Sequence, residues 1–369
     1  MEHDLDYYLP YKSLLKDPDD KVNYEEETFL YSSLYCLTNN NFCMKQFLKL
    51  NTIDENDTFY KPFYQIFYSM IKEIYKDITR NKESKSIKFI KEFINSMKKE
   101  EIKRYDPRIL IVYILIATLQ PLKKDQNDSI KIDQLLSSSF SHSFQHDIQY
   151  LIENDFVNLN LFLVSNSYKS IDDSYIWILN NYITNDKDNR NIIIKIKDIY
   201  GTESYEYLSY IQFNLIENEK YTMEKCFKNY LNEIIKKGEK SFYIEFPESI
   251  FIILFFGNKE ENPHKCLYNF SEILDFTDTE YVGKDLKYKK YFLSNLIVCK
   301  FPKQEKIIFY TFCRKNKKDK FNIYDCRVKE VREGFDAQKY LKKDKEVDFD
   351  STVSYPYVLV YTAIKDDER

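Results

Sequence analysis

Two stretches, FPESIFIILFF at Phe246–Phe256 and YFLSNLIVCKF at Tyr291–Phe301, decide the fold class of this chain. Both are rich in Ile, Leu, Val and Phe and are bounded by turn or charged residues, as buried β-strands usually are. The same pattern predicts strands throughout the second half, at Ile192–Ile196, Tyr207–Leu215, Ser241–Phe246, Ile250–Phe256, Phe292–Phe301, Lys306–Arg314, Lys320–Tyr324 and Tyr357–Ala363. One helix is predicted among them, at Tyr221–Lys237.

The first half of the chain shows apolar residues at helical spacing instead. Thr28–Thr38 follows the acidic triplet Glu25–Glu27, which suits the N-terminus of a helix. Further helices are predicted at Phe59–Tyr75, Ser86–Met97, Pro107–Leu119 and Ser141–Glu153, and Leu161–Tyr182 is compatible with helix or strand. Helices followed by strands predict an α+β fold.

The composition of the 369 residues excludes several classes of function. With 5 glycines the chain has no glycine-rich phosphate loop, and its net charge of −4 does not favour a nucleic-acid partner. Its apolar runs are too short to cross a membrane and its acidic N-terminus does not resemble a secretory signal, so an intracellular protein of the cytoplasm or nucleus is expected. The lysine-rich stretches Lys315–Lys320 and Lys342–Lys345 are predicted to be exposed loops.

The cysteines and histidines do not predict a metal or any other cofactor. No two of the seven cysteines have CxxC spacing, and reduced, mostly buried thiols are expected. His142 and His146 lie four residues apart, as zinc ligands on one helix face can, but no third ligand is evident and surface or capping roles are favoured. His264 and Cys266 follow Pro263 in a polar turn and receive the same interpretation.

The order of the predicted strands resembles the C-terminal half of ubiquitin-specific proteases, a family of papain-like deubiquitinases. FPESIFIILFF and the following FSEILDF at Phe270–Phe276 are similar to the family's Pro-led strand and its F-x-x-x-L-D segment. The family's YxLxxVVxH, GHYxAY, WYxFDDxxVxxV and AYxLFY segments then correspond, in the same order, to YFLSNLIVCKF, IIFYTFC at Ile307–Cys313, KFNIYDCRVKEV at Lys320–Val331 and YPYVLVY at Tyr355–Tyr361.

The resemblance extends into the first half. VNYEEETFLYSSLYCL at Val22–Leu37 is similar to the family's nucleophile box, NxxNTCYxNSxLQxL, and QHDIQYLI at Gln145–Ile152 to its QQDAxEFL helix. The resemblance implies one papain-like domain, with an N-terminal extension at 1–20, a helical thumb-like half at 21–190 and a β-rich half of fingers and palm at 191–369. It also implies shortened fingers without zinc, because Cys226 is the sole cysteine in that region.

The residues that would carry catalysis in this family are replaced. The resemblance places Thr28 at the position of the nucleophilic Cys, Ile308 at that of the His, and Tyr324 at that of the Asp or Asn in a gapless alignment. A shift of one residue would bring Asp325 to the last position. Other family-like residues are retained, namely Asn23 at the oxyanion position and Gln145 and Asp147 as candidate binding residues.

A cysteine protease needs a thiolate, an imidazole and a group that orients the imidazole, so these replacements predict a catalytically inactive protein. Such a member would act as a protein-binding or scaffold subunit, with ubiquitin or a larger complex of spliceosomal or proteasomal type as candidate partners. An alternative is an active thiol deubiquitinase with displaced residues, using Cys36 or Cys43 with His264, since no histidine follows His264 in any register. A third interpretation is an unrelated α+β protein.

Overall fold

The computed structural model describes residues 24–40, 43, 107–108, 111, 192–197, 200, 203–208, 210–234, 241–256, 263–277, 287–301, 307–325, 332–346 and 353–365. The predicted helices at Phe59–Tyr75, Ser86–Met97 and Ser141–Glu153, and the segment Leu161–Tyr182, lie outside the described residues. The chain divides into two compact units, one of residues 1–187 with 326–330 and one of residues 188–325 with 331–369.

In the first unit, helix α1 spans Tyr24–Thr38 and confirms the helix predicted at Thr28–Thr38, with an earlier start. Its hydroxyl side chains bond back to carbonyls one turn earlier: Ser33 Oγ donates to Phe29 O at 2.8 Å, and Thr38 Oγ1 donates to Leu34 O at 2.7 Å. These bonds let hydroxyl groups stay buried in the helix at little cost. Residues 107, 108 and 111 are also helical, within the helix predicted at Pro107–Leu119.

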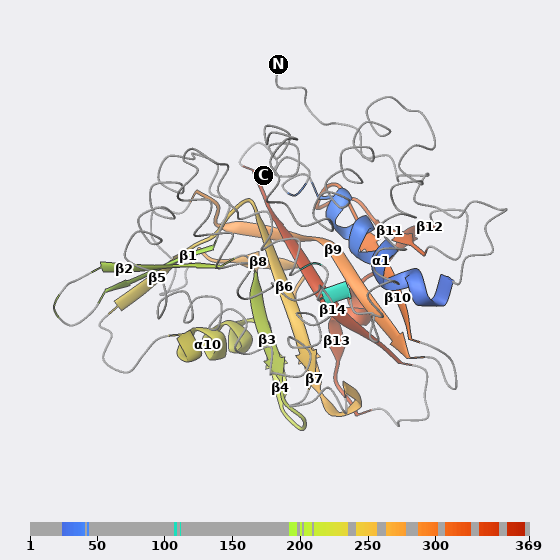
Figure 1. Ribbon diagram of the computed structural model, residues 1–369, viewed down its shortest axis with the longest axis horizontal. Coiled ribbons are helices and arrows are strands. Elements are labelled where there is room, and N and C mark those ends of the chain that lie inside the picture. The colour runs from blue at the N-terminus through green and yellow to red at the C-terminus, as the bar shows by residue number, and fades with distance from the viewer. Residues whose placement is uncertain are drawn as a thin grey trace, which may run out of the picture. The chain divides into compact units, whose positions relative to one another are not determined.

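The second unit contains an eight-stranded sheet with the order β12-β11-β10-β9-β14-β6-β3, in which β8 also pairs with β9 (Figure 1). Its strands are β3 Ile211–Leu215, β6 Ser249–Phe256, β8 Ile273–Asp275, β9 Lys290–Phe301, β10 Ile308–Cys313, β11 Phe321–Tyr324, β12 Arg332–Phe335 and β14 Val353–Ala363. Neighbouring strands are antiparallel except β3 and β6, which are parallel.

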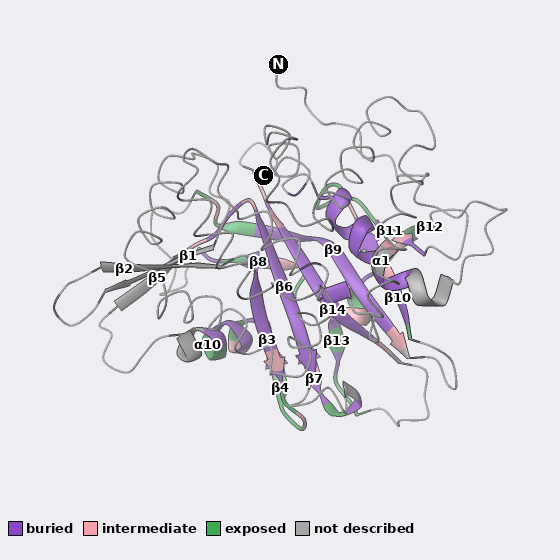
Figure 2. Cartoon of the chain, in the orientation of Figure 1, coloured by how far each residue is buried: buried purple, intermediate pink, exposed green. Residues whose placement is uncertain are grey.

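The core of this sheet lies along β6, β14 and β9, which Figure 2 shows as largely buried. Val358 of β14 lies opposite Ile253 of β6 on one side and Ile297 of β9 on the other, and all three are fully buried. All eight residues of β6 are buried. Strands covered on both faces read as continuous apolar runs, which explains why the sequence predicts them so clearly.

Two small sheets and three short helical segments complete the described part of this unit. One sheet has the order β2-β1-β5 and the other β13-β7-β4, and the helical segments are α10, η3 and α11. Their bounds are β1 Ile192–Lys197, β2 Glu203–Leu208, β4 Lys220–Thr222, α10 Met223–Ile234, β5 Ser241–Glu245, η3 Pro263–Lys265, β7 Leu267–Asn269, α11 Gln338–Leu341 and β13 Lys342–Lys343. Helix α10 packs on β3 through an edge-to-face contact of Phe227 with Phe213, with ring centroids 5.1 Å apart.

The structure corrects three expectations about these elements. The single strand predicted at Tyr207–Leu215 is two strands, because β2 pairs with β1 and the chain then changes sheets to pair β3 with β6. The helix predicted from Tyr221 begins at Met223, after β4, where Thr222 Oγ1 accepts a bond from Lys225 N at 3.2 Å. The lysines at 342–345 are not all exposed, because Lys343 pairs with Tyr268 and is buried.

No helix of the described residues has both the length and the apolar character needed to cross a membrane.

Candidate functional site

The residues that the resemblance assigns to catalytic positions belong to both units. Thr28 lies in α1 of the first unit and is buried. Ile308 is the first residue of β10, Tyr324 is the last residue of β11, and Asp325 follows it, all in the second unit. Asn23, Gln145 and Asp147 lie outside the described residues.

The pairing of β10 with β11 bears on the choice between Tyr324 and Asp325. Thr311 lies opposite Tyr324 in this antiparallel pair, so their side chains share one face of the sheet. Side chains alternate between faces along a strand, so Ile308, three residues before Thr311, points to the other face. Continuing the alternation by one residue brings Asp325 to the face of Ile308. The register thus shows that Tyr324 and Ile308 lie on opposite faces of the sheet, and the choice of Asp325 for the acidic position stays a prediction.

Position 308 itself cannot take part in proton transfer. Ile308 lies opposite Lys300 of β9 and is 3% exposed. An isoleucine side chain has no ionisable group, so it can neither accept a proton from a thiol nor donate one to a leaving amine. Tyr324 is no substitute base, because burial raises the pKa of its hydroxyl and keeps it protonated at neutral pH.

His264 is held in a structural cluster of η3, β13 and β14, which corrects its interpretation as a surface or capping residue. Its ring is buried, its Nδ1 lies 2.7 Å from the hydroxyl of Tyr355, and Lys343 Nζ donates to its carbonyl at 2.5 Å. Burial, and then the charge of Lys343, lowers the pKa of His264. These contacts tie His264 to β13 and β14, and β9 lies between β14 and the strand that carries Ile308.

The thiols that could replace the nucleophile are unsuited to the task. Cys36 and Cys43 are both fully buried, and burial raises the pKa of each well above that of a free thiol. A catalytic thiol needs the opposite shift, toward the thiolate at neutral pH. The six described cysteines are all buried thiols. Among the described residues there is also no cluster of three or more His, Cys, Asp or Glu that could hold a metal ion.

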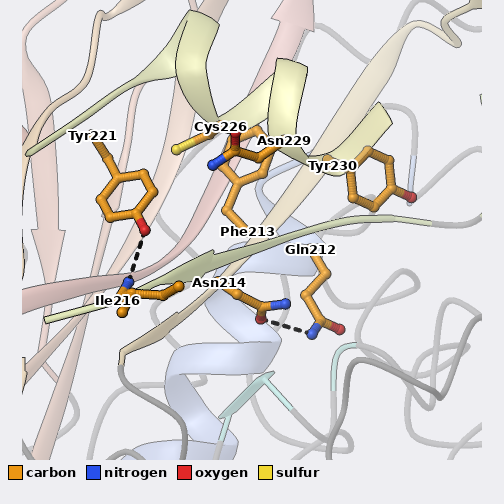
Figure 3. A pocket seen from close by; sticks show the side chains of 8 residues that line it. All are labelled: Gln212, Phe213, Asn214, Ile216, Tyr221, Cys226, Asn229 and Tyr230. Atoms are coloured by element: carbon orange, nitrogen blue, oxygen red, sulfur yellow. Dashed lines mark hydrogen bonds between the residues drawn. The ribbon is translucent and has the colours of Figure 1, made fainter. Parts of the chain in front are cut away.

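A hollow of about 240 Å³ lies between β3 and α10 in the second unit (Figure 3). Its wall is lined by Gln212, Phe213, Asn214, Ile216, Tyr221, Cys226, Asn229 and Tyr230. Two hydrogen bonds shape it, from Gln212 Nε2 to Asn214 Oδ1 at 2.9 Å and from Ile216 N to Tyr221 Oη at 3.1 Å. None of the lining residues is charged, and burial raises the pKa of Cys226 to about 12, so the hollow does not offer acid–base or thiol chemistry.

Comparison with known proteins bears on the fold. No protein-family model matches the chain, and no curated protein matches it in sequence. A chain of the yeast SAGA DUBm containing a mutant Sgf73 is similar in structure, with a TM-score of 0.51 and 11% sequence identity over 97% of this chain and 68% of that chain.

Two further solved structures are similar. The SAGA Ubp8/Sgf11/Sus1/Sgf73 DUB module contains a chain that matches with a TM-score of 0.51 and 12% identity, over 97% of this chain and 69% of that chain. An essential yeast splicing factor matches at 14% identity over 97% of this chain and 71% of its own, but its TM-score of 0.48 is too low to support a shared fold by itself.

Because the sequence identity is only 11–12%, the SAGA matches support a shared fold and nothing more. The division into thumb, palm and fingers stays a prediction. The described part of the chain is mostly β-sheet. The chain therefore has a ubiquitin-specific-protease-like fold, shared with a chain of the SAGA DUB module.

Proposed function

We propose that this chain is a catalytically inactive protein of the ubiquitin-specific protease type that acts as a protein-binding or scaffold subunit. The observation that carries the proposal is the buried isoleucine, Ile308, at the head of β10. In the family resemblance this position belongs to the histidine that activates the thiol. A fold that keeps its sheet but loses the base can still offer a binding surface.

Two further observations support the loss of catalysis. No histidine follows His264 in the sequence, so a base cannot be supplied to β10 by a shift of register. His264 itself is occupied by Tyr355 and Lys343. Asp325 remains a candidate for the group that would orient an imidazole, but position 308 itself supplies an isoleucine instead.

The alternative, an active thiol deubiquitinase with displaced residues, is the weaker interpretation. It would require Cys36 or Cys43 to ionise, although burial raises the pKa of both thiols. It would also require His264 to leave a buried hydrogen bond of 2.7 Å to Tyr355. Each requirement adds a free-energy cost before any chemistry begins.

The partner is proposed to be a protein, either ubiquitin or a subunit of a larger complex. Both matching DUB-module structures belong to assemblies of several chains, which supports a subunit role. The charge of −4 gives no support to a nucleic-acid partner. A location in the cytoplasm or nucleus stays a prediction.

The proposal is tested by titrating the purified chain with mono-ubiquitin and following both binding and cleavage. Isothermal titration measures binding, and a ubiquitin reporter with a C-terminal fluorogenic amide in the same buffer measures hydrolysis. Binding without hydrolysis would identify ubiquitin as the partner, and the absence of both would restrict the proposal to a scaffold for another protein. Catalytic turnover of the reporter would contradict it.

A further inference from the structure

The turn between β10 and β11 is a concentrated patch of positive charge. It reads RKNKKDK from Arg314 to Lys320, and every residue from Lys315 onward is exposed, which confirms the loop predicted there. Four lysines and one aspartate leave the exposed part with a net charge of +3, although the whole chain carries −4. The tip is therefore positively charged although the protein as a whole is acidic.

Hydrogen bonds fix the shape of this turn. Asn316 N donates to the carboxylate of Asp319 at 3.0 Å, and Asp319 N donates to Asn316 O at 3.1 Å. The single acidic side chain of the tip is thus engaged by the backbone. Because these bonds already order the backbone of the turn, less conformational entropy is lost when a partner binds to its lysines.

Arg314 anchors the base of the turn to the sheet. Its guanidinium lies 4.4 Å from the ring centroid of Phe321, its Nε donates to Leu293 O at 2.7 Å, and its Nη2 pairs with Glu272 at 2.8 Å. Its Nη1 also donates to the carbonyl of Lys317 at 3.4 Å. The charge of Arg314 is therefore balanced inside the fold, and the charge available to a partner is that of the lysines.

Three of these lysines, Lys317, Lys318 and Lys320, form no ion pair with any described residue. The tip is also remote from the degenerate catalytic position. Strand β10 runs from Ile308 to Cys313 before the turn begins, a length of about 17 Å at ~3.3 Å per residue. A partner bound at the tip could leave position 308 uncovered.

We propose that this tip, Lys315–Lys320, is a docking surface for an acidic segment of a partner protein. The argument is charge complementarity on a pre-shaped turn. A nucleic acid is disfavoured because residues 315–320 include no aromatic side chain on which a base could stack, and because the chain as a whole would repel a long polyanion. The inference rests on the proposed function only in expecting a protein partner.

The test uses the full chain and a short fluorescein-labelled oligoglutamate, with a labelled single-stranded DNA of equal length for comparison. Binding is followed by fluorescence anisotropy at low and at physiological ionic strength. The variant Lys317→Glu/Lys318→Glu removes the patch. The matched control, Lys287→Glu/Lys289→Glu, changes two exposed lysines before β9 and alters the net charge by the same amount.

We expect the tip variant to bind oligoglutamate at least about fivefold more weakly than the wild type, and the control variant to remain within about twofold. Binding should also weaken as salt is added. Equal loss in both variants, no binding by the wild type, or tighter binding of the DNA would each overturn the proposal. None of these results depends on ubiquitin cleavage, so failure here is distinguishable from failure of the proposed function.

Discussion

At the scale of single residues, the proposed loss of catalysis depends on the residues at the histidine position, Ile308, and at the acidic position, Tyr324 or Asp325. The resemblance left open whether Tyr324 or Asp325 occupies the acidic position. The pairing of Thr311 with Tyr324 puts Tyr324 on the opposite face from Ile308, and the assignment of Asp325 to the acidic position stays a prediction. Sequence reasoning could not settle a shift of one residue, since such a shift is set by cross-strand hydrogen bonds rather than by composition.

The replacement of Thr28 gives a first prediction. Thr28→Cys should restore a thiol at the nucleophile position and still give no hydrolysis, because no imidazole is present at position 308 to ionise it. The measurement is release of a fluorogenic amide from the ubiquitin C-terminus. Thr28→Ser serves as a control for the change at this buried site. Turnover by Thr28→Cys alone would show that the base has been assigned to the wrong residue.

Lys343 gives a second prediction, about pH. This side chain is 8% exposed, and burial lowers its pKa from 10.5 to about 8. Because the unfolded-state value is higher, the unfolded chain binds more protons between these two pH values, and the free energy of unfolding should rise with pH across that window. In Lys343→Met this rise should be absent.

Urea unfolding at about pH 8 and about pH 9.5 checks this, and the wild type should gain stability relative to Lys343→Met as the pH increases. The two proteins must be compared because buried tyrosines also affect the pH dependence. Burial raises the pKa of Tyr355, for example, so this residue lowers the free energy of unfolding as the pH increases further. Parallel pH profiles for the two proteins would show that Lys343 is not desolvated as described.

At the scale of elements, the β10–β11 hairpin depends on its anchor. Arg314 is 7% exposed at its side chain and Glu272 is 20% exposed, so their ion pair is largely removed from water. Arg314 also stacks on Phe321, and Glu272 accepts a bond from Gln338 Nε2 at 2.7 Å. Arg314 therefore connects the hairpin to β9 through Leu293 and, through Glu272, to the residue that precedes β8 and to α11.

Removal of this anchor gives a third prediction. Arg314→Ala should lower the free energy of unfolding by about 2–4 kcal/mol, because it leaves a partly buried carboxylate unpaired and deletes the stack. Lys317→Ala, an exposed residue of the same turn, should change it by less than about 0.5 kcal/mol. Urea unfolding of both variants provides the measurement. Equal effects would mean that the ion pair adds nothing beyond surface charge.

The predictability of the elements follows from their burial. The long strands β6, β9 and β14 were predicted because burial on both faces requires continuous apolar residues. The two-residue strand β13 was missed because Lys342 and Lys343 carry no such pattern. Its place depends on pairing with Tyr268 and on the contact of Lys343 with His264, which lies 79 residues away in sequence.

At the scale of the whole molecule, the order of the strands identifies the fold more securely than any single motif does. The structural match covers 97% of the chain at 11–12% identity, so the fold persists where few residues agree. The sequence alone shows which residue stands at each position that the resemblance assigns to catalysis. From the sequence, the lysine-rich tip could be predicted only as an exposed loop. The shape of this turn depends on hydrogen bonds of Arg314 and Asp319 that form in the folded chain.

The central claim, that this fold has lost its base and cannot hydrolyse ubiquitin conjugates, is tested most directly by a single-turnover assay. The wild-type chain, in excess over a ubiquitin reporter with a C-terminal fluorogenic amide, is compared with His264→Ala and Cys43→Ala. The account predicts that all three release the fluorophore no faster than buffer. Release by the wild type that is abolished by either substitution would contradict it and would establish a displaced catalytic pair.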